Sequence, residues 1–298
     1  MAAYEIEQTD IINSNALEQL KIQKFSLKEI NWREFPWWFV ALTLVSATTL
    51  IIVLTNSAYH EAFLFIIAGL GLTAIITLAA FTIAVILGLI TGLSRISDGV
   101  FVKNAATFYV ELVRGVPMLV LMFFIAFVLV PGFVNGINGL GGALNNAGLS
   151  GFGNILSALS IRDIPMTVRA VIALSLTYGA FLAEVFRAGI QSISRGQMEA
   201  ARSQGMSYGQ AMRYVILPQA VRNVLPALGN DFISMLKDSS LVSVLAVRDI
   251  TQVARLYAGH SFRFAESYTS LAILYLVMTI SLSLIIKVIE RRYANYDR

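Results

Sequence analysis

Long apolar runs separated by short polar stretches dominate the pattern of this chain. The first run, residues 36–54, has about the 20 residues that a helix rising about 1.5 Å per residue needs to cross a hydrocarbon core about 30 Å thick. Five more runs follow, at residues 66–93, 117–130, 165–187, 218–236 and 270–289. The pattern predicts an all-α integral membrane protein with about six transmembrane helices.

The second run is longer than one straight crossing requires, so we expect it to tilt or to extend toward Arg95. Small residues interrupt this run, and small residues allow two membrane helices to approach closely. They are Gly69, Gly71, Ala79, Ala80 and Gly88. We therefore expect close helix packing along residues 66–93.

Two polar regions flank or interrupt the apolar runs. Residues 1–35 contain no long apolar run and carry several basic residues, which predicts a cytoplasmic N-terminal tail. Residues 131–164 are rich in glycine and asparagine, and this composition predicts an extracytoplasmic loop with little regular structure. All three tryptophans stand at the beginning of the first run, where amphipathic rings favour the headgroup layer.

Lysine and arginine are enriched in loops on the cytoplasmic side of a membrane, so their distribution predicts the topology. On the side of both termini lie Lys21, Lys24, Lys28, Arg33, Arg95, Lys103, Arg114, Arg187, Arg195, Arg202, Arg213, Lys287, Arg291, Arg292 and Arg298. The opposite side holds Arg162, Arg169, Lys237, Arg248, Arg255 and Arg263. The distribution places both termini in the cytoplasm, although the basic residues between positions 237 and 263 fit it less well.

Composition supports lipid as the main solvent of this chain. It is 57% hydrophobic and 13% charged, with a mean hydropathy of +0.71, whereas an ordinary soluble domain is about one quarter charged. There is no cysteine, which excludes disulfides and thiolate chemistry. The net charge of +4 does not indicate nucleic-acid binding, because the basic residues cluster at the ends of apolar runs.

Sequence motifs do not indicate an enzyme. The two histidines, His60 and His260, are far apart and belong to no H-E-x-x-H pattern, and no G-x-x-x-x-G-K-[ST] pattern that would cradle ATP phosphates occurs. We expect no bound cofactor on this chain.

The polar segment at residues 191–218 has strong helix signals. Ser194 and Gln197 have the spacing of a capping box, and Gly205 suits the left-handed position after a helix, which predicts a helix over residues 195–204. Ser207 and Gln210 repeat the spacing and predict a second helix. Such an element is often only a connector between two spans, and from its residues alone that interpretation stays open.

The segment also contains Glu199-Ala200-Ala201, then Gly205, then Val215-Ile216-Leu217-Pro218, and this order resembles the EAA motif of ABC-importer permeases. Residues 109–120, 177–190 and 217–251 are similar to the polar amino acid branch of that family. The resemblance implies a type I importer fold over residues 66–290, made by the last five spans. The tail and the span at residues 36–54 precede this core.

The same resemblance implies a function and partners. The chain would be the permease subunit of an importer for amino acids in the bacterial cytoplasmic membrane. The 191–218 segment would be a coupling helix that inserts into a cleft of a separate ATPase. Its coupling residues would be Glu199, Ala200, Ala201, Gly205, Leu217 and Pro218. The complex would contain two ATPase subunits that bind ATP and Mg, a second permease and an extracytoplasmic binding protein.

Charged side chains in a membrane need a partner or a wet cavity. Glu184 and Arg187 are three residues apart on one helix, which predicts a structural ion pair. A polar cluster at the end of the fifth run offers both signs of charge, as an amino acid would require. It consists of Asn230, Asp231, Lys237, Asp238, Ser239 and Ser240. These residues are candidates for the substrate path, and a purely structural network is an equal alternative.

Two other functions remain open at this point. The chain could be an ABC permease for another small polar solute, or an ion-coupled secondary transporter, since apolar helices with a few buried charges would serve either. A docking helix on the cytoplasmic side favours the ABC permease. The sequence does not determine which amino acid is carried, or whether the second permease is identical or paralogous.

Overall fold

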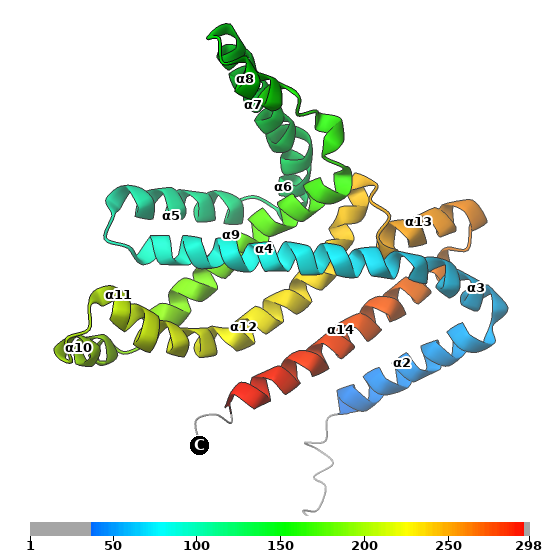
Figure 1. Cartoon of the computed structure of the whole chain (residues 1–298). Coiled ribbons are helices and arrows are strands. Elements are labelled where there is room, and N and C mark those ends of the chain that lie inside the picture. The colour runs from blue at the N-terminus through cyan, green and yellow to red at the C-terminus, as the bar shows by residue number, and fades with distance from the viewer. Residues whose placement is uncertain (1–36, 295–298) are drawn as a thin grey trace, which may run out of the picture. The chain divides into compact units, whose positions relative to one another are not determined.

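The computed structural model describes residues 37–294, and the regular elements in this range are all helical (Figure 1). The α-helices are α2 (Trp37–Thr55), α3 (Ser57–Ile66), α4 (Leu70–Ile96), α5 (Val100–Arg114), α6 (Met118–Phe124), α7 (Val130–Asn146), α8 (Ser150–Ser157), α9 (Met166–Gln191), α10 (Arg195–Ser203), α11 (Tyr208–Ala211), α12 (Leu217–Asp238), α13 (Ile250–Ser261) and α14 (Phe264–Ala294). The predicted tail, residues 1–35, lies outside the described residues.

Short turns of other helix types connect several of these helices. The 3₁₀ turns are Ile67–Gly69, Ile161–Asp163 and Ser239–Leu245, and the π-helical turns are Ile125–Leu129 and Met212–Ile216. The chain divides into two compact units within α2, between Ile51 and Ile52. The first unit contributes the apolar N-terminal part of α2, and the second contains α3 to α14.

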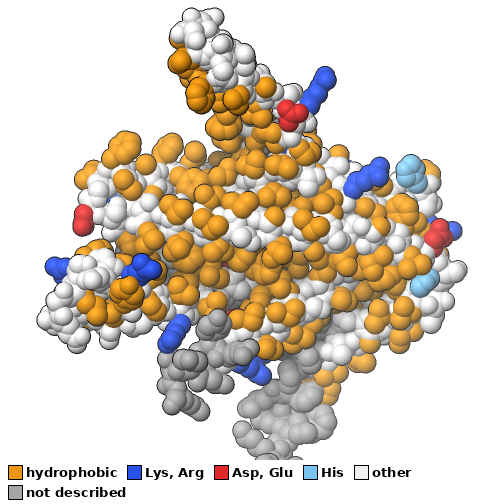
Figure 2. All heavy atoms as spheres, in the orientation of Figure 1, with side chains coloured by type: hydrophobic (Ala, Val, Ile, Leu, Met, Phe, Trp, Pro, Cys, Tyr) orange, Lys and Arg blue, Asp and Glu red, His pale blue; other side chains and the backbone are white. Residues whose placement is uncertain are grey.

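The prediction of an all-α membrane protein is confirmed. Helices occur at all six predicted runs. Within the described residues, four helical stretches are long and apolar enough to cross a membrane: Ser57–Ile96, Met118–Asn146, Met166–Gln191 and Phe264–Arg291. Figure 2 shows hydrophobic side chains over most of the visible face along α4, with basic side chains near its edges. The 22-residue helix α12 is not among the four, because it is more polar.

The prediction of an irregular loop at residues 131–164 is wrong. The π-helical turn Ile125–Leu129 joins α6 to α7, so that one helical stretch continues past Pro131, and α8 folds back against α7. A Cβ atom on Gly141 would lie 2.7 Å from the carbonyl oxygen of Gly153, so glycine is needed for this close approach. Glycine and asparagine therefore serve helix packing here, although their usual local preference is for turns.

Helices α4 and α9 share the most extensive contact between any two elements. A Cβ atom on Gly92 would lie 2.9 Å from the carbonyl oxygen of Ala183, which places the two backbones nearly in contact. The hydroxyl of Ser175 in α9 donates to the carbonyl oxygen of Ala80 in α4 at 3.2 Å. The predicted close packing is present at Ala80 and Gly88, whereas Gly71 faces open space.

A second close approach joins the first part of α4 to α13. A Cβ atom on Gly69 would lie 2.7 Å from the backbone nitrogen of Ile250, which also donates to the hydroxyl of Thr73 at 3.0 Å. Helix α14 packs against α3, α12 and α13. The bundle therefore depends on small residues and side-chain hydroxyls at helix crossings, as is usual in membranes.

Replacement of Gly88 by alanine tests the α4–α9 contact. The new Cβ atom would lie 2.6 Å from the Cβ atom of Leu182, so the helices must separate, and we expect a loss of stability of about 1–3 kcal/mol. Gly71→Ala is the matched control, because nothing lies within 4 Å of its added Cβ atom. Thermal unfolding of both variants in detergent measures the effect. Equal unfolding temperatures would contradict the assigned packing.

Candidate functional site

The structure forms the first predicted helix of the 191–218 segment as α10. The helix ends where Gly205 adopts a left-handed φ of 87°, and the backbone N–H of Met206 donates to the carbonyl oxygen of Ala201 at 3.2 Å. This is the predicted glycine termination. The predicted capping box at Ser194 is wrong, because its side chain makes no capping bond and the N–H of Gln197 donates to the Ser194 carbonyl oxygen at 3.0 Å.

The second predicted capping box is formed. The backbone N–H of Ser207 donates to the Gln210 side chain at 2.8 Å, and the backbone N–H of Gln210 donates to the Ser207 hydroxyl at 3.3 Å. The helix that starts here continues through the π-helical turn into α12. Leu217 and Pro218 therefore lie at the beginning of α12, inside a continuous helical stretch that needs no separate connector.

The three residues of the Glu199-Ala200-Ala201 triplet differ in exposure. Ala201 is buried and lies on the side of α10 that contacts the π-helical turn, whereas Glu199 and Ala200 are exposed. Successive residues of a helix point about 100° apart, so one short triplet can serve both sides. Glu199 and Ala200 are available to a partner protein, and Ala201 holds α10 against the rest of the segment.

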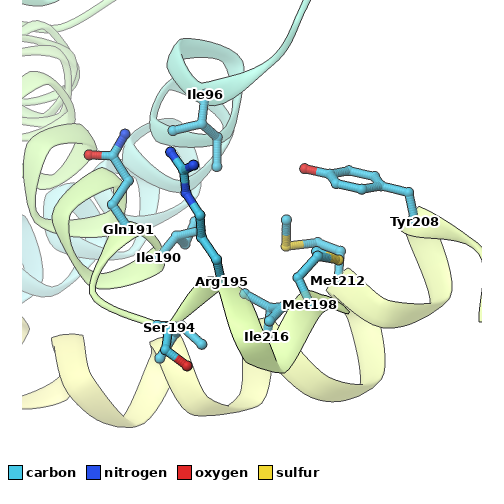
Figure 3. A pocket seen from close by; sticks show the side chains of 10 residues that line it. Ile96, Ile190, Gln191, Ser194, Arg195, Met198, Tyr208, Met212 and Ile216 are labelled. Atoms are coloured by element: carbon cyan, nitrogen blue, oxygen red, sulfur yellow. The ribbon is translucent and has the colours of Figure 1, made fainter. Parts of the chain in front are cut away.

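A pocket of about 350 Å³ lies beneath α10 (Figure 3). Its lining residues are Ile96, Ile190, Gln191, Ile193, Ser194, Arg195, Met198, Tyr208, Met212 and Ile216. Beside the pocket, α10 packs against α11 and the π-helical turn that follows it, and along the chain it is joined to α9 before it and to α12 after it. A displacement of α10 would therefore move the ends of these two helices.

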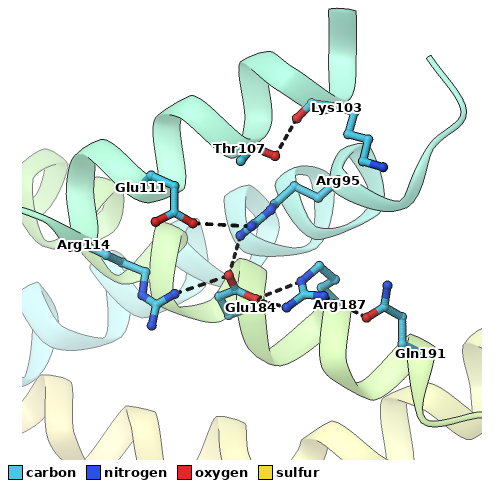
Figure 4. Close-up of polar contacts among 8 residues, drawn as sticks. All are labelled: Arg95, Lys103, Thr107, Glu111, Arg114, Glu184, Arg187 and Gln191. Atoms are coloured by element: carbon cyan, nitrogen blue, oxygen red, sulfur yellow. Dashed lines mark hydrogen bonds and ion pairs between the residues drawn. The ribbon is translucent and has the colours of Figure 1, made fainter. Parts of the chain in front are cut away.

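Glu184 of α9 is surrounded by three guanidinium groups (Figure 4). The predicted ion pair with Arg187 is present, with Nη2 2.8 Å from Oε2 of Glu184. Arg95 and Arg114 both contact the other carboxylate oxygen, Arg114 at 3.3 Å, and Arg95 also lies 3.6 Å from Oε1 of Glu111. One carboxylate thus joins the end of α4 and the end of α5 to α9.

The polar cluster of α12 divides into an inner and an outer part. Asp238 accepts a hydrogen bond of 2.7 Å from the hydroxyl of Tyr178 in α9, and Asp231 is half-buried one heptad earlier. Asn230 and Lys237 are exposed on the neighbouring side of the helix. The inner carboxylates therefore face α9, and the outer amide and ammonium groups face away from this subunit's core.

The two serines that follow Asp238, Ser239 and Ser240, differ in how exposed they are. Ser239 begins the 3₁₀ turn, is buried, and donates its hydroxyl to the carbonyl oxygen of Leu236 at 2.7 Å. Ser240 is half-buried. Ser239 lies on the same side as the buried residues Met235 and Leu236, so only part of the predicted cluster is exposed.

Four residues with evident roles were not identified as site residues from the sequence: Arg95, Glu111, Arg114 and Tyr178. Arg95 and Arg114 are 89 and 70 residues from Glu184 along the chain, and Tyr178 is 60 residues from Asp238. No short sequence pattern could therefore predict these contacts. Within residues 37–294, no cluster of three or more His, Cys, Asp and Glu side chains is arranged to hold a metal ion.

Comparison with known proteins gives a consistent result. Residues 84–295 match the family described as binding-protein-dependent transport system inner membrane component. The probable glutamine ABC transporter permease protein GlnM of Bacillus subtilis is 36% identical over 223 residues, which are 74% of this chain and 88% of the relative. The glutamine transport system permease protein GlnP of Escherichia coli is 31% identical over 236 residues, 79% of this chain and 96% of the relative.

Solved structures agree with the sequence relatives. A structure described as an amino acid ABC transporter with histidines is 38% identical, has a TM-score of 0.62, and matches 80% of this chain and 97% of its own. The MetNI methionine ABC transporter in an inward-facing conformation has a TM-score of 0.58 at 18% identity, covering 77% of this chain and 96% of its own, and supports the fold alone. Together with a family match over most of its length, these likenesses show that the chain belongs to the inner membrane components of binding-protein-dependent transport systems, the permease subunits of ABC importers.

Proposed function

We propose that this chain is the permease of an amino-acid importer and that its substrates pass along the outer polar side of α12. Relatives named for glutamine and a 38% identical amino acid transporter support the substrate class. The observation that carries the proposed path is the exposure of Asn230 and Lys237 on a helix of membrane-spanning length. A charged side chain in or beside the hydrocarbon core needs a partner or water, so a water-lined path is a better surrounding than lipid.

The path would be completed by a second permease, because the outer polar side of α12 points away from this subunit's own core. Asp231 and Asp238 would border the path on the side of α9, and Asp238 would be held in place by the hydroxyl of Tyr178. A carboxylate pair and an ammonium group match the two charges of a zwitterionic amino acid. The carboxylate of the substrate would thus pair with Lys237, and its ammonium group with the two carboxylates of α12.

The 191–218 segment would transmit the motion of two ATPase subunits. Exposed Glu199 and Ala200 would contact the ATPase, and Gly205 would keep α10 at its angle to α11. Motion would pass through α12 from Leu217 and Pro218, and through α9. Since this chain carries no phosphate-binding loop, ATP and Mg would be bound by the partner, and an extracytoplasmic protein would deliver the substrate.

The distribution of basic residues indicates the side of the membrane on which the termini and the loops lie. We propose that both termini lie in the cytoplasm, with the coupling segment on the same side. The span at residues 36–54, observed as α2, would be accessory to the permease core of residues 66–290. The α7–α8 hairpin would then lie on the extracytoplasmic side.

The substitution Gly205→Val tests the proposed coupling role of the 191–218 segment. A β-branched residue is strained by about 1–2 kcal/mol at a left-handed φ of 87°, so we expect α10 to shift and ATP-driven uptake to fall while membrane insertion stays normal. Gly209→Val is the matched control, because both glycines have open space around them and only Gly205 has a positive φ. Uptake and ATPase co-purification are measured together. Equal uptake by the two variants would remove the role of Gly205.

Neutral substitutions on α12 test the path and the substrate class together. Loss of one charge-assisted contact costs about 1.5–3 kcal/mol, so Asp231→Asn, Lys237→Gln or Asp238→Asn should weaken apparent affinity by about tenfold to a hundredfold. The measurement is competition among amino acids for uptake into vesicles that contain the purified importer. Lys103→Gln on α5 is the control. If assembly yield falls but the ranking of competitors stays as in the parent, the cluster is structural.

We propose that Glu184 is structural and does not contact substrate. Glu184→Gln leaves three arginines without their shared carboxylate, and we expect a loss of stability of about 3 kcal/mol. Glu111→Gln should cost less than about 1 kcal/mol, because Glu111 is 63% exposed and lies 3.6 Å from Arg95. Thermal unfolding compares the two. A stable Glu184→Gln protein with an altered ranking of amino acids would place Glu184 in the path instead.

A further inference from the structure

The α7–α8 hairpin, residues 130–157, is embedded in a stretch without charge. The chain has no Asp, Glu, Lys, Arg or His residue between Arg114 and Arg162. An ordinary soluble segment is about one quarter charged, so a loop in water would be expected to carry several charges over this length. The composition is that of a segment whose surroundings are at least partly apolar.

Both helices of the hairpin have an exposed apolar side. In α7 this side includes Phe133 and Leu140, which are 66% and 64% exposed and lie seven residues apart, about two helical turns. In α8 it includes Phe152 and Ile155, which are 73% and 71% exposed. Figure 2 shows these helices at the top, with hydrophobic atoms gathered along one side of the hairpin and other atoms along the opposite side.

The opposite side consists of small, neutral polar residues. Asn135 and Asn146 of α7 and Asn154 of α8 are exposed there, and the other contributors are serine and glycine. A protein-binding surface normally has a charged or strongly polar rim around its apolar centre. At the boundary between lipid and water, neutral amides and hydroxyls keep their hydrogen bonds to water while the apolar side enters the membrane.

The turn between the two helices leaves few backbone groups unpaired. The N–H groups of Ala147, Gly148 and Leu149 donate to the carbonyl oxygens of Ala143, Asn145 and Leu144, at 3.0–3.1 Å. Gly148 allows this by adopting a φ of 82°. Backbone groups in or near lipid must be satisfied within the protein, and this turn meets that requirement.

The two helices of the hairpin are held together, and the segment that follows the hairpin is fixed to the membrane-spanning part. Gly141 and Gly153 bring the two helices into backbone contact, and the Asn138 side chain donates to the carbonyl oxygen of Leu159 at 3.0 Å. At its base, Arg169 donates to the carbonyl oxygens of Ile161 and Ala126, at 2.7 and 3.3 Å. The guanidinium group of Arg169 is therefore bound by carbonyl oxygens, and the residue is only 8% exposed.

The apolar surface of the hairpin continues from a membrane span. Helices α6 and α7 with the π-helical turn between them form the single apolar stretch Met118–Asn146. At about 1.5 Å per residue, its 29 residues exceed the thickness of a hydrocarbon core of about 30 Å. The seven residues of α6 and the five of the π-helical turn cover only about 18 Å, so the first part of α7 lies within the hydrocarbon core and its end extends beyond it. Exposed Phe127 lies in the π-helical turn and exposed Phe133 in the first turn of α7.

We propose that the α7–α8 hairpin is a lipid-embedded element, with Phe133, Leu140, Phe152 and Ile155 inserted among the acyl chains at one surface of the bilayer. It anchors the α6–α9 corner of the permease in the membrane. The occupant of its apolar side is phospholipid, and the neutral Asn and Ser side faces the headgroups and water.

The absence of cysteine in this chain permits a direct test, because a single introduced cysteine is the only one that this chain carries, and the importer assembled with the unchanged chain gives the background labelling. Phe152→Cys and Ile155→Cys are each labelled with a polarity-sensitive fluorophore, in the complete importer reconstituted into phosphatidylglycerol and phosphatidylethanolamine vesicles. Asn154→Cys on the polar side of the same helix is the matched control. Phe152 and Ile155 are largely exposed, so their replacement removes little internal packing, and uptake by each labelled protein confirms its assembly.

Quenching by phospholipids brominated on their acyl chains is compared with quenching by aqueous iodide. We expect several-fold stronger lipid quenching, and several-fold weaker iodide quenching, at positions 152 and 155 than at position 154. Equal iodide quenching at all three positions would show a hairpin in water and overturn the proposal. Protection of positions 152 and 155 from both quenchers would show that a protein, either a second permease or the binding protein, covers the hairpin, and would overturn it as well.

Discussion

Two apolar helices in lipid gain little from the hydrophobic effect when they pack together, so this bundle depends on close backbone approach and on polar contacts between helices. The contact of α4 with α9 supplies both. Gly88 and Gly92 let the backbones meet, and Glu184 on the same face of the bundle binds arginines from α4 and α5. Without this contact, neither the end of α9 nor the polar side of α12 would have a defined position.

Helix α9 connects the structural and the proposed functional parts of the molecule. It carries Tyr178, which binds Asp238 of α12, and Glu184, which gathers the arginines, and it ends at Gln191 where the 191–218 segment begins. Gln191 itself accepts a hydrogen bond of 2.8 Å from Arg187. The proposed coupling segment, the ionic cluster and the proposed path are therefore all connected to one helix.

The polar side chains of the membrane-spanning part have two kinds of surroundings: some are paired within the subunit and others are exposed on its surface. The carboxylate of Glu184 is paired with three arginines of the same subunit. Lys237 and Asn230 remain exposed on one subunit, so their environment must come from outside it. The polar residues exposed on α12 make this helix less apolar than the other long helices, and their solute-facing role belongs to the proposed path.

The sequence by itself determined the features that depend on neighbouring residues. Apolar runs of sufficient length located the six helices, the Ser207 and Gln210 spacing located a helix start, and Gly205 located a helix end, because caps and turns involve residues only a few positions apart. The order of Glu199, Ala200, Ala201 and Gly205 also indicated the family that the comparisons show. Each of these signals lies within a short segment of the chain.

Only the tertiary structure decided the features that depend on distant residues. The glycines of residues 131–164 have a turn-forming preference, and they form a helical hairpin because α7 and α8 each supply the surface against which the other packs. Ser194 makes no side-chain cap although it precedes α10, and Ser239 is buried because it follows the buried residues Met235 and Leu236 by four and three positions. Helix packing decides that Arg95 and Arg114 contact Glu184 and that Tyr178 contacts Asp238. These partners are far apart along the chain, and the number of residues between them does not determine their distance in space.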